Sequence, residues 1–139
     1  MYISFDAITS CIRSILNFGH TFGHALESAT GYSKRLLHGE GVILGSCLAL
    51  NLSNKLNLIG KEEIARIEGH FIKCGFKTRI NQLPGKLLNE EQIIDIMYQD
   101  KKVTNNQLNF ILLNKIGKGK LVKNVDPKYV KDVLKESIN

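Results

Sequence analysis

The sequence predicts one mainly helical domain with a single small β-hairpin. Apolar residues recur at helical spacing along most of the chain, and one short apolar run near the C-terminal quarter has strand character instead. No internal repeat or low-complexity linker divides the 139 residues. A chain of this length suits one domain, 1–139, and can bury a sizeable core.

Three helices are predicted in the first half of the chain. The first covers residues 11–29, and Gly31 can end it. The second, residues 39–57, is so apolar that we expect it to be buried on most sides. The third covers residues 61–74, with Gly75 just past its end.

Two more helices are predicted from their capping residues. Asn89 can cap a fourth helix, and Gln92 lies three residues on, where its side chain can reach back. Asp126 can cap a last helix, in which Pro127 takes the first position and Ser137 lies near the end.

The predicted hairpin lies between these two helices. Residues 107–113 are typical of a buried strand, and residues 121–125 can pair with it across a turn at 117–119.

Composition excludes several classes of protein. Apolar residues make up 43% and charged residues 23%, as in ordinary globular domains, and no apolar run could span a bilayer. The N-terminus lacks the basic start of a signal peptide and carries Asp6 where such a peptide is apolar. Cys11, Cys47 and Cys74 are odd in number and unpaired in spacing, so we expect neither disulfides nor a thiolate zinc site. We therefore expect a cytoplasmic protein without a membrane partner.

The positive net charge of +6 leaves two alternatives open. The densest basic stretch, Lys115, Lys118, Lys120 and Lys123, surrounds the predicted hairpin, but no aromatic interleaving or recognised nucleic-acid module accompanies it. An anionic small-molecule substrate explains a positive site equally well. We expect no nucleic-acid partner.

The residues best suited to chemistry lie in the first predicted helix. His20 and His24 are four residues apart, which places both imidazoles on one helical face. Arg13 and Asn17 extend that face, so one stripe carries a cation, an amide and two imidazoles. A stripe of this kind makes a poor apolar core, because each buried polar group would need a partner.

Two glycines and a third histidine add to this pattern. Gly19 and Gly23 each precede a histidine, which indicates a close approach to the backbone by a ligand or by another helix. His38, at the start of the next helix, could fold back over His20. The three histidines could form a metal site or only a polar cluster. His70 fits an ordinary surface or packing residue.

Two segments carry a family resemblance. LNFGHTFGHALE at 16–27, followed by LHGE at 37–40, closely resembles the central signature of 3-dehydroquinate synthase. DKK at 100–102 and the segment 110–117 resemble the family's later pattern. The resemblance covers nearly the whole chain in the right order, and it implies the helical C-terminal domain of the dehydroquinate synthase-like fold.

The resemblance implies a metal site and a catalytic residue. His20 and His38 match two ligands of the family's divalent metal, zinc or cobalt. The third family ligand is a glutamate from the preceding region, which this chain does not contain. His24 matches a histidine near the substrate phosphate that is linked to proton movement.

The resemblance also implies how the substrate, a sugar-acid phosphate, is held. Arg13 matches the arginine that binds its carboxylate, and Asn17 matches an asparagine on the phosphate side. One of Lys101 and Lys102 matches a substrate-binding lysine. A guanidinium fork suits a carboxylate, and amide and ammonium donors suit a phosphate.

The implied reaction converts 3-deoxy-D-arabino-heptulosonate 7-phosphate into 3-dehydroquinate and phosphate, in the shikimate pathway, with NAD and a homodimeric enzyme. No GxGxxG motif or βαβ pattern that could seat NAD is present, so we expect NAD to bind a missing N-terminal domain. The chain would then be an engineered domain, a split subunit or a truncated gene product, inactive alone unless a separate N-terminal chain completes it. A related sugar phosphate cyclase and a non-catalytic helical remnant or interaction module are the alternatives.

The chain departs from the family pattern near its proposed site. Ser10 and Cys11 stand where a glycine pair is usual, and Thr9 stands where a glutamate is common. The acidic cluster is reduced to Asp6, and Gly41 replaces the common alanine after the HGE triplet.

Overall fold

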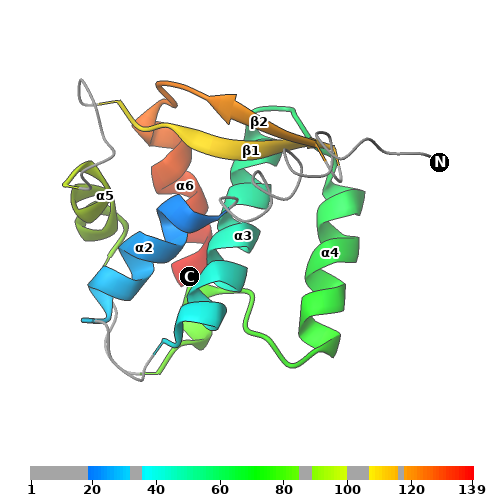
Figure 1. Cartoon of the computed structure of the whole chain (residues 1–139), viewed down its shortest axis with the longest axis horizontal. Helices are drawn as coiled ribbons and strands as arrows, with labels where there is room; N and C mark the ends of the chain where they lie inside the picture. The colour runs from blue at the N-terminus through cyan, green and yellow to red at the C-terminus, as the bar shows by residue number, and fades with distance from the viewer. Residues whose placement is uncertain (1–18, 32–35, 85–88, 100–106, 116–117) are drawn as a thin grey trace, which may run out of the picture.

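The computed structural model describes residues 19–31, 36–84, 89–99, 107–115 and 118–139 (Figure 1). In chain order, the elements are α2 (His20–Ala29), α3 (His38–Lys55), α4 (Lys61–Lys73), the 3-10 helix η1 (Ile80–Gln82), α5 (Glu90–Tyr98), β1 (Phe110–Lys115), β2 (Lys118–Val122) and α6 (Pro127–Ile138). The two strands pair antiparallel. The prediction of a mainly helical fold with one small hairpin is confirmed.

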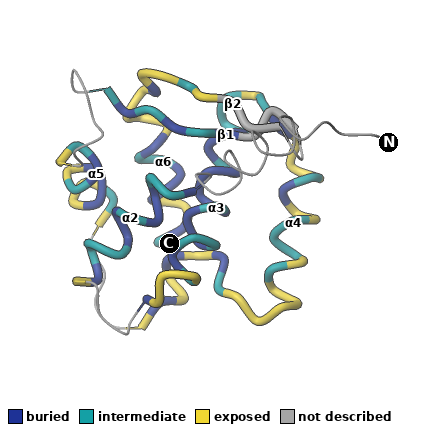
Figure 2. Tube along the Cα trace, viewed as in Figure 1, coloured by how far each residue is buried: buried dark blue, intermediate teal, exposed yellow. Residues whose placement is uncertain are grey.

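Helix α3 is the centre of the fold. It packs against α2, α6 and β1, while α4 lies on its other side (Figure 1). Half of its residues are buried, as expected from the apolar run. Helix α4, by contrast, buries only Ile64 and is largely exposed along its length (Figure 2).

The core joins the hairpin to the helices around α3. Phe22 of α2 stacks on Phe110 of β1, with ring centroids 5.0 Å apart. Met97 of α5 and Leu134 of α6 are also buried in this cluster. Within the part of the chain that the structure describes, no helix combines the length and apolar character needed to cross a membrane.

The predicted first helix is interrupted at Gly19. Gly19 has a φ of 80°, in the left-handed region, and α2 begins at the next residue. A right-handed helix cannot pass through that conformation, so a continuous helix over 11–29 is wrong at this point. Residues 11–18 lie outside the described residues. Gly31, with a φ of 69°, follows the end of α2 as expected.

The predicted caps are confirmed. Asn89 Oδ1 accepts the backbone N–H of Gln92 at 2.9 Å, and Gln92 Oε1 accepts the backbone N–H of Asn89 at 3.0 Å. Asp126 Oδ1 accepts the backbone N–H of Lys128 at 2.9 Å. Each bond satisfies a donor that the first turn of a helix leaves unpaired, which is why these sequence signals are reliable.

The hairpin is present, but both strands lie nearer the turn than the predicted ranges 107–113 and 121–125. At the end of the ladder, Asn109 Oδ1 accepts the backbone N–H of Asn124 at 2.8 Å, and Asn124 has a left-handed φ of 55°. A side chain here replaces a backbone partner. One residue further on, the backbone N–H of Val125 donates to the Leu108 carbonyl at 2.9 Å. Gly119, expected in the turn, is paired within the ladder instead.

Candidate functional site

Helices α2 and α3 cross in direct backbone contact, and glycines line the crossing. A Cβ on Gly45 would overlap the carbonyl oxygen of Gly19 and would lie 2.7 Å from the backbone nitrogen of Gly23. A Cβ on Gly23 would lie 3.0 Å from the carbonyl oxygen of Gly41. Of the two explanations for the glycines beside the histidines, approach of another helix is therefore the correct one.

Gly19 meets two separate requirements. Its φ of 80° is a conformation that side chains other than glycine rarely adopt. A Cβ there would also lie 2.5 Å from the backbone nitrogen of Ser46. The glycine is thus needed both for the entry into α2 and for the contact with α3.

This crossing brings the three predicted histidines together. The ring centroids of His20 and His24 are 5.3 Å apart, and those of His20 and His38 are 6.3 Å apart. The first two lie on α2 and the third is the first residue of α3. His20 and His24 are partly buried, and His38 is exposed. The sequence-based expectation that His38 folds back beside His20 is met.

The donor set fits part of a metal site. Two imidazoles on one tetrahedral zinc, with nitrogens about 2 Å from the ion, have centroids about 5 Å apart. The separation of His20 and His24 suits such sharing, and that of His20 and His38 is near the upper limit. Among the described residues, however, no three His, Cys, Asp or Glu side chains are placed to hold a metal ion together. A complete site would need at least one further ligand.

Sequence reasoning assigned no role to Glu27, which the structure places beside His38. The carboxyl oxygen Oε1 of Glu27 lies 2.5 Å from Nδ1 of His38, and the Glu27 side chain is only 12% exposed. The position of Glu27 in the sequence does indicate that it lies near the histidines. Glu27 follows His20 by seven residues and His24 by three, so all three share one face of α2.

The first turn of α3 is held by the HGE triplet itself. Glu40 Oε1 accepts the backbone N–H of Leu37 at 3.0 Å, as in half of a capping box. Its other oxygen, Oε2, lies 3.9 Å from the Lys77 ammonium. A carboxylate in the first turn is also favoured by the helix dipole. These contacts fix where α3 begins, and therefore where His38 lies.

Four predicted site residues lie outside the described residues: Arg13, Asn17, Lys101 and Lys102. Their assignments remain predictions. His70 is exposed on α4, as expected for an ordinary histidine, and lies 3.9 Å from the sulfur of Cys74.

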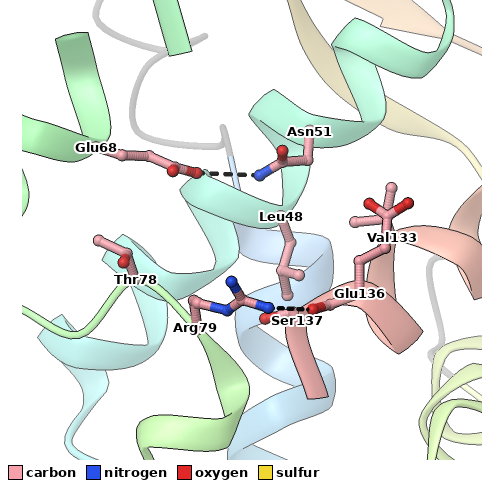
Figure 3. Close-up of a pocket in the computed structure, with 8 residues that line it drawn as sticks. All are labelled: Leu48, Asn51, Glu68, Thr78, Arg79, Val133, Glu136 and Ser137. Carbon is pink, nitrogen blue, oxygen red and sulfur yellow. Dashed lines mark hydrogen bonds between the residues drawn. The ribbon is translucent and has the colours of Figure 1, made fainter. Parts of the chain in front are cut away.

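A cavity of about 160 Å³ lies on a different side of α3, facing α4 and α6 (Figure 3). Its polar walls are largely paired with each other. Asn51 Nδ2 donates to Glu68 Oε1 at 3.0 Å, and the Arg79 guanidinium donates to the carbonyl oxygen of Glu136 at 2.5 Å. None of the three clustered histidines lines it. We interpret it as a packing defect between helices.

Burial shifts two acidic groups near this cavity. Burial raises the pKa of the Glu68 carboxyl above 4.5, although its bond from Asn51 and the charge of Arg79 act in the opposite direction. Burial, and to a smaller extent the charge of Glu68, raises the pKa of the Cys47 thiol to about 12. Cys47 therefore remains a thiol at neutral pH, and its burial makes it a small packing residue.

Comparison with known proteins connects this geometry to one family. The family description "3-dehydroquinate synthase C-terminal" matches residues 2–103. The 3-dehydroquinate synthase of Bradyrhizobium diazoefficiens is 47% identical over 130 residues, covering 91% of this chain and 34% of the relative. That of Paracoccus denitrificans is 49% identical over 125 residues, covering 90% and 34%. The chain thus spans about a third of the length of these relatives.

Solved structures share the fold. A 2-deoxy-scyllo-inosose synthase complexed with carbaglucose-6-phosphate, NAD+ and Co2+ matches with a TM-score of 0.72 and 26% identity, over 87% of this chain and 34% of that one. The 2-epi-5-epi-valiolone synthase ValA from Streptomyces hygroscopicus subsp. jinggangensis, with NAD+ and Zn2+ bound, has a TM-score of 0.70 and 20% identity, over 85% and 31%. With the histidine signature at the α2–α3 crossing and the family match over most of the sequence, the chain belongs to the 3-dehydroquinate synthase C-terminal family.

Proposed function

We propose that this chain is the metal- and substrate-binding part of a 3-dehydroquinate synthase. The reaction would convert 3-deoxy-D-arabino-heptulosonate 7-phosphate into 3-dehydroquinate and phosphate, a step of the shikimate pathway to aromatic amino acids. The observation that carries the proposal is the cluster of His20, His24 and His38 at the glycine-lined crossing, in a chain 47–49% identical to two such synthases.

The histidines have separate roles in this proposal. His20 and His38 hold the divalent metal, zinc or cobalt, and His24 acts on a proton near the substrate phosphate. When bound, NAD supplies the transient oxidation of one substrate alcohol, and the metal polarises the substrate hydroxyls. The protein's part is to hold the three imidazoles in a fixed arrangement, which the backbone contact between α2 and α3 supports.

The two anionic ends of the substrate are assigned to residues that the sequence identifies. Arg13 binds the carboxylate, and Asn17 with Lys101 or Lys102 binds the phosphate side. These contacts give affinity and orientation. Because none of them supplies the transient oxidation that precedes loss of phosphate, they cannot give turnover alone.

The proposal places the remaining requirements outside this sequence. The third metal ligand and the NAD site are expected in a region that corresponds to the rest of the relatives' length, on the same polypeptide or on a separate N-terminal chain. A homodimer and a cytoplasmic location are part of the same proposal. The 139 residues alone should therefore not make 3-dehydroquinate.

Another sugar phosphate cyclase is the second candidate, because the chain shares its fold with 2-deoxy-scyllo-inosose synthase. The identity of 26% to that enzyme, against 47% and 49% to the two synthases, favours the first proposal. A non-catalytic helical module is the third. If the chain is such a module, any metal binding should not depend on His20 or His38.

Complementation tests the activity. The purified chain is assayed for phosphate release with substrate, NAD and zinc, with and without the N-terminal two thirds of the Paracoccus denitrificans synthase. Activity should appear only on mixing, and His24→Ala or Arg13→Ala should remove it. His70→Ala, an exposed histidine on α4, is the matched control and should keep it. Phosphate release by the chain alone would refute the predicted inactivity. No release in any mixture, with folded partners, would refute the assigned reaction.

Calorimetric titration with zinc tests the metal site. With two of three protein ligands, the chain should bind zinc weakly or not at all, and His20→Ala should abolish whatever binding exists. His70→Ala should not change it. Tight one-to-one binding that survives both His20→Ala and His38→Ala would show that other residues hold the metal.

A further inference from the structure

Glu27 and His38 form a contact between the end of α2 and the start of α3. The 2.5 Å separation of Glu27 Oε1 and His38 Nδ1 is short enough for a charge-assisted hydrogen bond. The carboxyl side is shielded, with 12% of the Glu27 side chain exposed, while 68% of the His38 side chain is exposed. The shielded Glu27 carboxyl therefore restricts the orientation of the exposed His38 ring.

This contact sets which nitrogen of His38 carries the proton. A neutral imidazole has one N–H donor and one acceptor nitrogen. A carboxylate only accepts, so Nδ1 is the donor toward Glu27 and Nε2 keeps its lone pair. In a neutral ring, this contact favours the tautomer that leaves Nε2 without a proton, and the ring lies 6.3 Å from that of His20.

Glu27 is itself held in place. Its backbone carbonyl accepts the Thr30 hydroxyl at 3.0 Å, where α2 ends. Its side chain lies against Gly41, where an added Cβ would come 3.4 Å from Glu27 Cγ and Oε1. Because Gly41 has no side chain, the Glu27 carboxyl fits against the first turn of α3, beside His38.

We propose that Glu27 is a positioning residue that fixes the tautomer and ring orientation of His38, so that Nε2 is presented as the metal-binding nitrogen. Metal-binding histidines commonly donate their second N–H to a carboxylate in this way, and loss of the carboxylate typically weakens metal affinity 10–100-fold. The inference rests on the proposed function for the identity of the ligand that Nε2 meets. The tautomer itself does not depend on it.

The test is long-range 1H–15N NMR of the histidine rings in the metal-free 139-residue chain, at alkaline pH, where ordinary imidazole is neutral. His38 should have its proton on Nδ1. In Glu27→Ala it should move to the Nε2–H form that free imidazole side chains favour. Glu40→Gln is the matched control, because it changes a carboxyl two residues from His38 while its Oε1 can still accept the Leu37 N–H.

Each outcome is decisive. His38 as Nε2–H in the unaltered chain would overturn the inference without any variant, so the inference can be refuted even if Glu27→Ala fails to fold. An Nδ1–H form that persists in folded Glu27→Ala would also overturn it. Loss of the Nδ1–H form in Glu27→Ala but not in Glu40→Gln would support it. The proposed function fails by a different measurement, the complementation assay, so the two failures are distinguishable.

Discussion

Helix α3 packs in two different ways on its two sides. Toward α2 the contact is backbone on backbone, through Gly23, Gly41 and Gly45, with no room for a side chain at the tightest point. Toward α4 and α6 the contact is made by side chains around a cavity of about 160 Å³, lined by polar groups. The α2–α3 interface leaves almost no room for the helices to shift, whereas side chains between α3 and the helices α4 and α6 can rearrange.

The difference matches where the candidate site lies. The histidines and Glu27 flank the rigid crossing, where a small shift of one helix would move one ring relative to another. A metal site tolerates errors of only a few tenths of an ångström in ligand position. The loosely packed side of α3 carries none of the predicted site residues that the structure describes.

The largest expected effect is on the crossing itself. Gly45→Ala places a methyl group on the Gly19 carbonyl and the Gly23 amide, which are backbone atoms that cannot rotate away. We expect a loss of about 3 kcal/mol or more in the free energy of unfolding, because overpacking against fixed atoms forces the helices apart. Urea unfolding followed by far-UV circular dichroism measures it.

Gly41→Ala is the matched control, one helical turn earlier on the same face. The atoms nearest to its Cβ would be side-chain atoms of Glu27 and Leu36, at 3.4–3.5 Å, which is ordinary contact. Alanine also gains up to about 1 kcal/mol of helix propensity over glycine. We expect stability within about 1 kcal/mol of the unaltered chain. Equal losses for both variants would mean that the crossing is not the rigid contact described.

These two glycines also show where sequence reasoning ends. The caps at Asn89 and Asp126 were predictable because their partners lie two or three residues away. The same holds for His20 and His24, which one helix places together. Gly45 drew no attention in the sequence, because its meaning depends on the Gly19 carbonyl, 26 residues earlier in the chain, and only the fold brings the two together. Spacing alone places Glu27 on the face of His20 and His24, but its contact with His38 depends on the fold, since that partner is on another helix.

An intermediate effect is expected where η1 meets α6, beside the cavity. Ser137 Oγ accepts the backbone N–H of Ile80 at 2.8 Å, and both residues are buried. Ser137→Ala leaves that N–H without its acceptor, which should cost about 1–3 kcal/mol. The exposed Asn81, which donates to the Asn139 carbonyl at 3.3 Å across the same contact, gives the control. Asn81→Ala should change stability by only a few tenths of a kcal/mol.

The comparison of Ser137→Ala with Asn81→Ala shows how readily the packing around η1 and α6 can rearrange. A loss near the upper figure for Ser137→Ala would mean that the seam between η1 and α6 is sealed from water. A loss no larger than that of Asn81→Ala would mean that water from the cavity replaces the hydroxyl. In that case the seam is more adaptable than the contact distances indicate.

The smallest expected effect concerns Glu68, and its sign depends on pH. Burial raises the pKa of this carboxyl in the folded chain above its ordinary value of 4.5. A group with a raised folded-state pKa contributes stability that is fully present below the ordinary value and is lost as pH rises through the folded value. At pH 7 the ionised carboxyl therefore destabilises the fold relative to a neutral group of the same shape. Glu68→Gln removes the charge, while its side-chain oxygen can still accept from Asn51.

We expect Glu68→Gln to raise the free energy of unfolding at pH 7 by less than about 1 kcal/mol, because the carboxyl is only partly buried and solvent screens it. The gain should disappear below about pH 4, where both side chains are neutral. Urea titrations at several pH values, with the exposed Asp95→Asn as control, measure the difference. A loss of stability at pH 7 would mean that attraction to Arg79 and the bond from Asn51 outweigh the cost of burial. Charge interactions would then stabilise the side of α3 that faces α4 and α6. The two sides of α3 would differ mainly in the kind of contact they make, and less in how rigid they are.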